Sequence, residues 1–348
     1  MKTVLVTGGC GFIGSHFIRC LLREGAWRVV NLDKLTYAGD LDRLSDVAGD
    51  PRYRLVQGDI ADERLVEEVV ATERPWAIVN FAAESHVDRS ILDPAPFLRT
   101  NVQGVHVLLE AARRHEVGRF LQVSTDEVYG DAEGSEPRSE EDALRPSSPY
   151  AASKAAADLL CLAYRRTYGL RVVIARSSNN YGPYQHPEKL IPLVVRNLLE
   201  GEEVPVYGDG KQRRDWLFVE DNCRALLLLL EQSTVETIYN IATGVQVPNL
   251  QLVQSICRIL AQELGTDPAR LFDRIRFVPD RPGHDRAYAV RTDRIARTLG
   301  WKPKVDLGEG LRRTVQWYLA NRAWLTQRAG EEYRAYYEAV YRRGWKLE

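Results

Sequence analysis

Short runs of β-branched and apolar residues alternate with segments of helical periodicity over roughly the first half of the chain. The runs have the length of single buried strands: Thr3–Thr7, Arg28–Leu32, Tyr53–Gln57, Ala77–Phe81, Phe120–Ser124 and Arg171–Arg176. Between them, apolar side chains recur at helical spacing, first at Ile13, Phe17 and Leu21, and then over Leu65–Thr72, Phe97–His115 and Tyr150–Tyr168. This alternation predicts an α/β fold of the Rossmann type, a doubly wound parallel sheet with helices on both faces.

The rhythm changes after about Gly182, where Pro and Gly become frequent. Helices are predicted over Leu190–Leu199, Val219–Gln232 and Leu250–Leu264, whereas Arg276–Arg291 is charged and rich in loop formers. We therefore expect three parts. They are a sheet domain over 1–185, to which some later segments return, a smaller lobe over 186–330, and an aromatic-rich helical tail over 331–348.

Composition narrows the class of protein. The 348 residues carry 47 basic and 48 acidic side chains, a balance that disfavours a nucleic-acid binder, which needs a basic excess. The longest apolar run, Ala225–Leu230, is far shorter than the about 20 residues of a membrane span, and the N-terminus lacks a signal-peptide pattern. The five cysteines are widely spaced and the six histidines scattered. We therefore expect free thiols, a cytoplasmic setting, no metal site and no membrane partner.

A glycine-rich loop, Thr7–Gly14, follows the first predicted strand and opens the first predicted helix. Glycines let backbone N–H groups approach a pyrophosphate, and the helix N-terminus adds a positive dipole end. Asp33 closes the second strand 19 residues after Gly14, where a carboxylate binds a ribose diol and repels a 2′-phosphate. The pattern predicts NAD rather than NADP, with Asp59 and Ile60 near the adenine. The alternative is a glycine turn that binds some other phosphate.

Tyr150 and Lys154 are four residues apart on a predicted helix, which Ser148 caps and Pro149 begins. An unperturbed phenol has a pKa of about 10, too high for a base at neutral pH, and a nearby ammonium group lowers it. The pair therefore predicts proton transfer by Tyr150. The alternative is two ordinary residues on a helix surface.

The segment Ser124–Gly130 follows a predicted parallel strand, at the sheet edge where open α/β folds place their chemistry. A dehydrogenase that only moves a hydride to and from one carbon needs a hydroxyl and the Tyr–Lys pair. Asp126 and Glu127 stand directly after the hydroxyl of Thr125, so they add a second acid and base. The alternative is that both are solvated loop residues.

The spacing Gly-x-x-Gly-x-x-Gly resembles the extended short-chain dehydrogenase/reductase family, and the chain resembles its nucleoside diphosphate sugar 4,6-dehydratases, nearest to those acting on dTDP-glucose. The resemblance runs from Thr3 to about Leu319. It rests on eight segments: Thr7–Gly14, Phe81–Ser90, Ser124–Gly130, Tyr150–Lys154, Ser178–Tyr184, Pro187–Pro192, Arg213–Trp216 and Asp280–Asp285. Cys10 stands where the family often has alanine, which would place a thiol near the pyrophosphate.

The resemblance implies a hydro-lyase with five catalytic residues, Thr125, Asp126, Glu127, Tyr150 and Lys154. Thr125 would bind the sugar C4 hydroxyl, and Tyr150 would take its proton while NAD accepts the hydride. Glu127 would then remove the C5 proton, and Asp126 would protonate the departing C6 hydroxyl. Return of the hydride to C6 would give the 4-keto-6-deoxy sugar, a precursor of rhamnose and other deoxysugars, and would regenerate NAD.

The resemblance also implies the binding residues. The cofactor set is Gly8, Gly11, Phe12, Ile13, Gly14, Asp33, Lys34, Thr36, Asp59, Ile60, Phe81, Ala82, Ala83, Ser85, Thr100, Tyr150, Lys154 and Asn180. The set for the nucleotide-sugar substrate is Ser85, Thr125, Asn179, Lys189, Leu190, Pro205, Tyr207, Arg214, Asn249, Arg281 and His284. The residues 1–185 would then be the NAD-binding domain and 186–330 the nucleotide-sugar lobe. Family members are commonly homodimers, for which the helices Phe97–His115 and Tyr150–Tyr168 are the candidates.

Several alternatives remain open on the sequence. A 4,6-dehydratase of another sugar nucleotide, such as UDP-glucose, would show the same motifs, since one methyl group separates the two bases. A 4-epimerase or decarboxylase would share Tyr150 and Lys154 but would not need both Asp126 and Glu127. A GDP-mannose dehydratase typically uses NADP, which Asp33 disfavours. A non-catalytic NAD-binding protein would usually lack the tyrosine or the lysine.

Overall fold

A parallel sheet organises the molecule, which is a computed structural model describing residues 1–232, 236–328, 330, 337 and 340–341. Within the described residues it has seven strands in the order β10-β6-β5-β4-β1-β2-β3. The strands are β1 (Lys2–Thr7), β2 (Trp27–Asp33), β3 (Tyr53–Gln57), β4 (Ala77–Asn80), β5 (Arg119–Thr125), β6 (Val172–Ser177) and β10 (Ile238–Ile241). The predicted doubly wound parallel fold is confirmed, and each of the six predicted strands lies within one residue of an observed one.

Helices cover both faces of this sheet because successive strand residues point to opposite sides. Val4 and Val6 of β1 face α1 (Phe12–Glu24) and α8 (Val219–Glu231) in one apolar core. Leu5, between them, faces the other core. The second core is formed with α2 (Glu63–Glu73), α5 (Val105–Arg114) and α6 (Pro149–Tyr168). The carboxyl ends of the parallel strands are left for the loops that carry the predicted chemistry.

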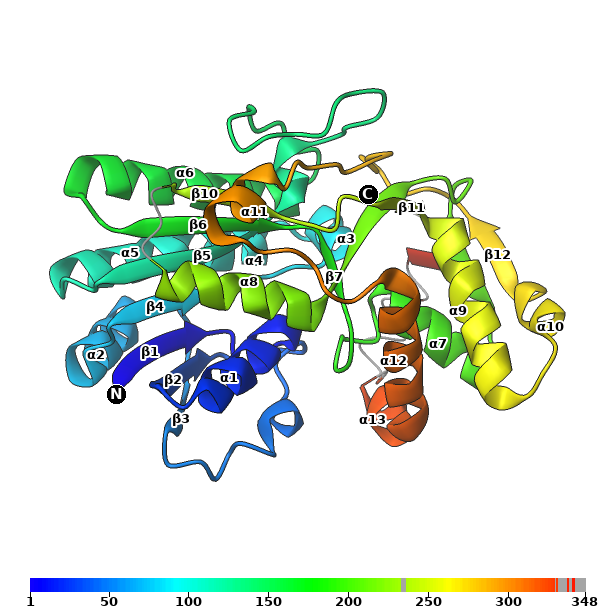
Figure 1. Ribbon diagram of the computed structural model, residues 1–348, viewed down its shortest axis with the longest axis horizontal. Helices are drawn as coiled ribbons and strands as arrows, with labels where there is room; N and C mark the ends of the chain where they lie inside the picture. The colour runs from blue at the N-terminus through cyan, green and yellow to red at the C-terminus, as the bar shows by residue number, and fades with distance from the viewer. Residues whose placement is uncertain (233–235, 329, 331–336, 338–339, 342–348) are drawn as a thin grey trace.

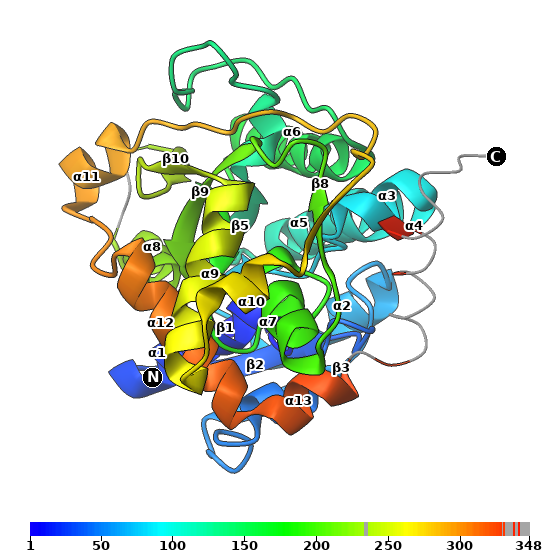
Figure 2. The same cartoon turned by 90° about the vertical axis from the view of Figure 1, so that its right-hand side faces the viewer.

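The later part of the chain forms a smaller group of elements beside the sheet, on the right of Figure 1 and facing the viewer in Figure 2. Its helices are α7 (Leu190–Glu200), α9 (Asn249–Leu264), α10 (Pro268–Phe272), α12 (Leu307–Ala320) and α13 (Arg322–Gln327). Its strands form two small sheets, β7 (Asn179–Tyr181), β9 (Arg213–Phe218) and β11 (Gln246–Pro248) in one, β8 (Val204–Tyr207) and β12 (Ile275–Val278) in the other. A third apolar core holds this group together.

Some later segments lie with the first part of the chain. Strand β10 pairs with β6 in the large sheet, and α8 packs on α1. Helix α11 (Asp293–Leu299) lies against β10. The division at 185 stays a prediction, and most of the tail 331–348 lies outside the described residues.

Two predicted elements differ from the structure. The first residues of Arg276–Arg291, the stretch predicted to be rich in loops, belong to strand β12. They form a strand because Phe277 and its neighbours pair with β8. The predicted helix Phe97–His115 is not continuous. It consists of α4 (Ala95–Leu98), a π-helical turn η2 (Arg99–Gly104) and α5.

The π-helical turn carries Asn101, whose side chain makes hydrogen bonds to two distant segments. Its amide accepts from Glu84 N–H at 2.9 Å and donates to Glu84 C=O at 2.9 Å, as a paired strand residue would. It also donates to Ser153 Oγ of α6 at 2.8 Å. The turn thus ties the segment after β4 to α6, and π-turns of this kind are frequent at functional sites.

All five cysteines are free, as the sequence predicts, and all but Cys20 are buried. The Cys10 thiol is fully buried and accepts from Asn31 Nδ2 at 3.3 Å, and its expected place near the pyrophosphate stays a prediction. None of the described helices has the length and apolar character needed to cross a membrane.

A buried ion pair joins four elements around α6. Asp158 of α6 is 0% exposed and Arg176 of β6 is 2% exposed, with 2.8 Å between Asp158 Oδ2 and Arg176 Nε. Arg176 also donates to Tyr129 Oη at 2.7 Å, and Tyr129 donates to Asn240 Oδ1 of β10 at 2.9 Å. The guanidinium group therefore depends on Asp158 for the counter-charge within its buried surroundings.

Asp158→Ala should destabilise the protein by about 3–5 kcal/mol, because it leaves the Arg176 charge buried without its carboxylate. Denaturant unfolding monitored by fluorescence measures this loss. Arg312→Ala is the matched control, since its 3.5 Å contact with Glu309 is half-exposed and should contribute under about 0.5 kcal/mol. Equal effects of the two substitutions would contradict the importance of the buried pair.

Candidate active site

One cavity at the carboxyl ends of the parallel strands brings most of the predicted site together. Every residue predicted to bind the cofactor lines it, from Gly8 after β1 to Asn180 in β7. All five predicted catalytic residues line it as well, and so do Ser85, Asn179 and Lys189 of the substrate set. Residues as distant in sequence as Gly8 and Lys189 therefore meet, because parallel strands present their carboxyl ends at one edge.

The glycine loop has room for a phosphate only because side chains are absent. Gly8 has φ +69°, and a Cβ there would lie 2.6 Å from the Ala82 nitrogen. A Cβ on Gly14 would lie 2.4 Å from Gly8 O. Helix α1 begins without a side-chain cap from any described residue, so its first N–H groups, at Phe12 and Ile13, stay available at the cavity. The loop fits the pyrophosphate of a dinucleotide.

Asp33 lies at the end of β2, where its carboxylate is fixed by backbone donors. It accepts from Cys10 N–H at 2.8 Å and from Leu35 N–H at 2.8 Å. A carboxylate held at this edge suits a ribose diol and repels a 2′-phosphate, which fits NAD. Asp59 is the residue that the sequence places near the adenine. Its Oδ2 lies 2.9 Å from Nζ of Lys34, a second residue of the cavity, so the two form an ion pair.

A segment that the sequence did not single out covers part of this cavity. Arg43, in the 3-10 helix η1 (Leu41–Leu44), is 1% exposed. It donates to the carbonyl groups of Cys10 at 2.9 Å and Tyr184 at 3.0 Å. Asp40 accepts from Trp324 Nε1 at 3.1 Å and Arg328 Nε at 2.7 Å, so α13 braces the same segment. No periodicity marks these residues, because their role arises only where distant loops meet.

The catalytic residues come from the end of β5 and the start of α6. Strand β5 runs into the 3-10 helix η3 (Asp126–Tyr129), where Thr125 Oγ1 accepts from Glu127 N–H at 3.2 Å. Lys154 Nζ donates to Val123 O at 2.7 Å, which fixes α6 against β5. Ser148 caps α6 by accepting from Ala151 N–H at 3.1 Å, as the sequence predicts, and Tyr150 lies in the first turn. The hydroxyl, phenol and both carboxyl groups thereby share one wall of the cavity.

Burial shifts the two adjacent carboxyl groups by different amounts. The pKa of Asp126 is raised well above its usual value by burial and by the neighbouring charge of Glu127. The pKa of Glu127 is also raised by burial, but Arg281, Arg214 and Lys189 oppose that rise. Two carboxyl groups with separated pKa values can act as an acid and a base in one site.

The structure does not support the expected effect of Lys154 on Tyr150. Burial raises the pKa of the Tyr150 phenol, and the charges of Glu127 and Asp126 raise it further, while a hydrogen bond with Thr125 opposes this. Burial also lowers the pKa of Lys154 to about 8. Lys154 Nζ donates to the Val123 carbonyl, so here the ammonium group fixes α6 on β5.

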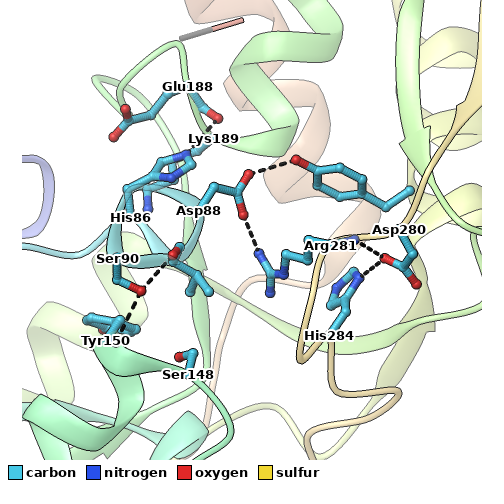
Figure 3. Close-up of polar contacts among 12 residues, drawn as sticks. His86, Asp88, Ser90, Ser148, Tyr150, Glu188, Lys189, Asp280, Arg281 and His284 are labelled. Atoms are coloured by element: carbon cyan, nitrogen blue, oxygen red, sulfur yellow. Dashed lines mark hydrogen bonds and ion pairs between the residues drawn. The ribbon is translucent and has the colours of Figure 1, made fainter. Parts of the chain in front are cut away.

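The remaining substrate residues do not line this cavity and form an adjacent group. They are Leu190, Pro205, Tyr207, Arg214, Asn249, Arg281 and His284. Asp88, which the sequence left without a role, holds part of this group (Figure 3). It accepts from Arg281 Nη1 at 3.0 Å and from Tyr207 Oη at 2.7 Å. His284 packs edge-on against the Tyr207 ring, with centroids 5.9 Å apart.

Tyr288, a second residue the sequence missed, connects this group to the catalytic carboxyl groups. Its hydroxyl lies 3.4 Å from Glu127 Oε2 and donates to Asp285 Oδ2 at 2.9 Å. The buried guanidinium of Arg214 lies over the Tyr288 ring at 4.2 Å. Lys189 Nζ donates to Ser85 O at 2.9 Å. Cations suited to a diphosphate therefore lie next to Glu127.

Two members of the predicted substrate set have less direct support. Leu190 begins α7 and packs against the third apolar core. Asn249 begins α9, and its Oδ1 is buried without a hydrogen-bond partner among the described residues. An orphaned buried amide oxygen of this kind is suited to a ligand donor. Asn179 Oδ1, which lines the cavity, is in the same state.

Comparison with known proteins places this site in a family. The profile of the GDP-mannose 4,6 dehydratase family matches residues 5–314. A dTDP-glucose 4,6-dehydratase of Neisseria meningitidis serogroup B is 50% identical over 337 residues, which cover 93% of this chain and 95% of that protein. One of Streptomyces niveus is 50% identical over 327 residues, covering 92% and 94%.

Solved structures agree with this assignment. DesIV of Streptomyces venezuelae, a dTDP-glucose 4,6-dehydratase with NAD and TYD bound, is 49% identical with a TM-score of 0.87, covering 93% of this chain and 98% of that one. A UDP-glucose 4-epimerase of Thermotoga maritima is 32% identical with a TM-score of 0.83, covering 92% and 100%. The chain therefore belongs to the GDP-mannose 4,6 dehydratase family and, within it, to the dTDP-glucose 4,6-dehydratases.

Proposed function

We propose that this protein converts dTDP-glucose to dTDP-4-keto-6-deoxyglucose and water while NAD stays bound. The observation that carries this proposal is the pair of carboxyl groups beside Thr125 and Tyr150 in the same cavity, Asp126 buried and Glu127 partly buried. Oxidation and reduction at C4 alone need only the hydroxyl, the phenol and the lysine. Two further carboxyl groups with separated pKa values suit an elimination, which must remove one proton and supply another.

The first proton transfer involves the C4 hydroxyl. Thr125 orients this hydroxyl, and Tyr150 accepts its proton as the phenolate. Burial and the charges of the two carboxyl groups disfavour that form, and the hydrogen bond with Thr125 favours it. When bound, NAD supplies the acceptor for the C4 hydride and the donor of the hydride that later reaches C6. Lys154 holds the phenol in place by fixing α6 on β5. Oxidation must come first, because the C5 proton becomes acidic only when C4 is a ketone.

The elimination then uses the two carboxyl groups in opposite roles. Glu127, whose charge is favoured by Arg281, Arg214 and Lys189, accepts the C5 proton. Asp126, whose pKa is raised well above its usual value, donates its proton to the C6 hydroxyl, which leaves as water. After C6 is reduced, Glu127 returns a proton to C5, and C4 stays a ketone. Tyr150 then still holds the proton of the C4 hydroxyl, whereas Asp126 has given one up. The site is restored when Tyr150 releases its proton and Asp126 takes one up, so the conversion releases one water with no net change in protons.

The reaction gives a product with a distinct mass. Incubating the purified protein with dTDP-glucose and no added NAD should yield a dTDP-sugar lighter by one water, detected by mass spectrometry. UDP-glucose in a parallel reaction should be turned over more slowly, because the base pocket is then missing one methyl contact. An unchanged mass with an inverted C4 would show an epimerase and contradict the proposal.

Glu127→Gln should leave C4 oxidation possible but stop the transfer of the C5 proton. We expect turnover to fall by about 10²–10⁴-fold, the usual contribution of a general base. In deuterated water, the wild-type product should gain deuterium at C5, and the variant should show no C5 exchange by NMR. Glu133→Gln, which alters an exposed carboxylate in a nearby loop, should exchange normally. Rapid exchange in Glu127→Gln would remove Glu127 from this role.

We also propose that the protein is a homodimer paired through α6 and the neighbouring α4–α5 region. Leu159 of α6 is 58% exposed and Leu98 of α4 is 57% exposed. Ala152 and Ala163 are exposed on the same face of α6 as Leu159, and together they form an apolar stripe along the helix. An exposed stripe of this kind favours association with a second copy.

Leu159→Arg should convert the dimer to a monomer, because the charge would be buried in the pairing face. Light scattering after size-exclusion chromatography measures the mass directly. Leu264→Arg is the control, since Leu264 is 42% exposed at the end of α9, away from this face. A wild-type mass equal to one chain would contradict the proposal.

We propose that the reaction takes place in the cytoplasm and supplies deoxysugar synthesis. Five free cysteines support a reducing compartment. A 4-keto-6-deoxy sugar nucleotide is activated at C1 and carries a ketone at C4. It therefore suits enzymes that epimerise, reduce or aminate the ring before a sugar is transferred, as in rhamnose synthesis.

A further inference from the structure

The short helix α3 (Val87–Leu92) lies between the catalytic phenol and the predicted nucleotide residues. Its side chains contact several separate parts of the site, as Figure 3 shows. Asp88 contacts Arg281 and Tyr207, and Ser90 contacts the backbone of Tyr150. The mechanism above uses none of the side chains of this helix.

The carboxylate of Asp88 holds two segments of the later part of the chain at once. One oxygen accepts from Arg281 Nη1 at 3.0 Å, and the other accepts from Tyr207 Oη at 2.7 Å. Tyr207 belongs to β8, whereas Arg281 belongs to the loop after β12. The Asp88 side chain is only 3% exposed and that of Arg281 15%, so water competes little for either contact.

The geometry leaves Arg281 able to bind a ligand. Asp88 engages Nη1, and Nε of Arg281 is buried without a hydrogen-bond partner among the described residues. A guanidinium group has five N–H donors in a fixed fork, so one contact fixes its plane while the other donors stay available. A flexible arginine would otherwise lose side-chain entropy when it bound a phosphate.

Ser90 fixes the same helix to the catalytic residue. Its hydroxyl accepts from Tyr150 N–H at 3.2 Å and donates to Val87 O at 2.6 Å. Asp88 and Ser90 are two residues apart, a rise of about 3 Å along the helix. Arg89, between them, pairs with Glu188 Oε2 at 3.1 Å. The nucleotide residues and the phenol are therefore mounted on one short, well-anchored element.

We propose that Asp88 is a positioning residue that orients Arg281 and Tyr207 to bind the nucleoside diphosphate of the substrate. It does so from a helix that also holds the Tyr150 backbone, so the nucleotide and the phenol keep a fixed separation. Asp88 itself needs no contact with the substrate. This role rests on the proposed function, because it assumes a nucleoside diphosphate sugar as the ligand.

Asp88→Asn tests the role with a side chain of the same size but no charge. Calorimetry should show the Kd for dTDP rising on the order of tenfold, the effect of one lost hydrogen bond between charged groups. The KM for dTDP-glucose should rise by a similar factor with kcat changed far less, since the lost contact acts on ground state and transition state alike. A merely structural ion pair would lower stability without this split between KM and kcat.

Two controls separate the nucleotide effect from general damage. Asp209→Asn removes one partner of the exposed Asp209–Arg286 pair, 2.9 Å apart in the same part of the chain, and should leave the Kd for dTDP unchanged. Ser90 lies on the same helix as Asp88, and Ser90→Ala removes its contact with the backbone of Tyr150. This variant should alter kcat while leaving the Kd for dTDP unchanged. If Asp88→Asn does not fold, Asp88→Glu keeps the buried charge but moves it, and should also raise the Kd.

A double-mutant cycle tests whether Asp88 acts through Arg281. In an Arg281→Met background, Asp88→Asn should add little to the rise in Kd, whereas independent roles would make the two effects add. An unchanged Kd for dTDP in folded Asp88→Asn or Asp88→Glu would overturn the proposal while leaving the proposed function intact. If the wild-type protein failed to bind dTDP, the proposed substrate itself would be wrong, and the role of Asp88 with it.

Discussion

The hydrogen bond from Lys154 Nζ to Val123 O sets the register between α6 and β5, and the rest of the site depends on it. A buried ammonium group needs a partner, and Val123, two residues before the end of β5, supplies a carbonyl for it. Strand β5 ends two residues later at Thr125, which Asp126 and Glu127 follow, and Tyr150 lies four residues before Lys154 in the first turn of α6. One contact between a helix and a strand therefore fixes the phenol against the hydroxyl and the two carboxyl groups.

Burial and neighbouring charges give the two carboxyl groups of Asp126 and Glu127 different pKa values. Asp126 and Glu127 are adjacent in sequence, but Asp126 is buried and Glu127 is only partly buried. The pKa rise of Asp126 is opposed by Arg214, and that of Glu127 is opposed by Arg281, Arg214 and Lys189. Tyr288 adds a hydroxyl at 3.4 Å from Glu127. The later part of the chain, which supplies these groups, thus determines which carboxyl acts as the base. A substrate diphosphate bound by the same arginines would reduce their effect on Glu127, so substrate binding and proton affinity are coupled.

The sequence predicted the sheet well because strand signals and the glycine loop are local. All six predicted strands were found, and every predicted cofactor residue lines one cavity. The failures share a tertiary origin. The π-helical turn carries Asn101, which pairs with Glu84, and the role of Arg43 depends on the carbonyl groups of Cys10 and Tyr184 in two distant loops. The effect of Lys154 on the phenol stays a prediction, and spacing on a helix could not show that a strand carbonyl accepts from the ammonium group.

Asp88 shows another reason why sequence alone misses site residues. It lies in Phe81–Ser90, a segment that carries the family resemblance, and the sequence still assigned it no role. Its partners, Tyr207 and Arg281, are 119 and 193 residues away, so no local pattern could indicate them. Around the cavity the two parts of the chain meet through contacts of this polar kind, including Lys189 with Ser85 and Arg328 with Asp40. Polar contacts are directional, so they fix distances between binding groups more tightly than apolar packing would. A reaction that moves protons at C4, C5 and C6 of one bound sugar depends on such fixed distances.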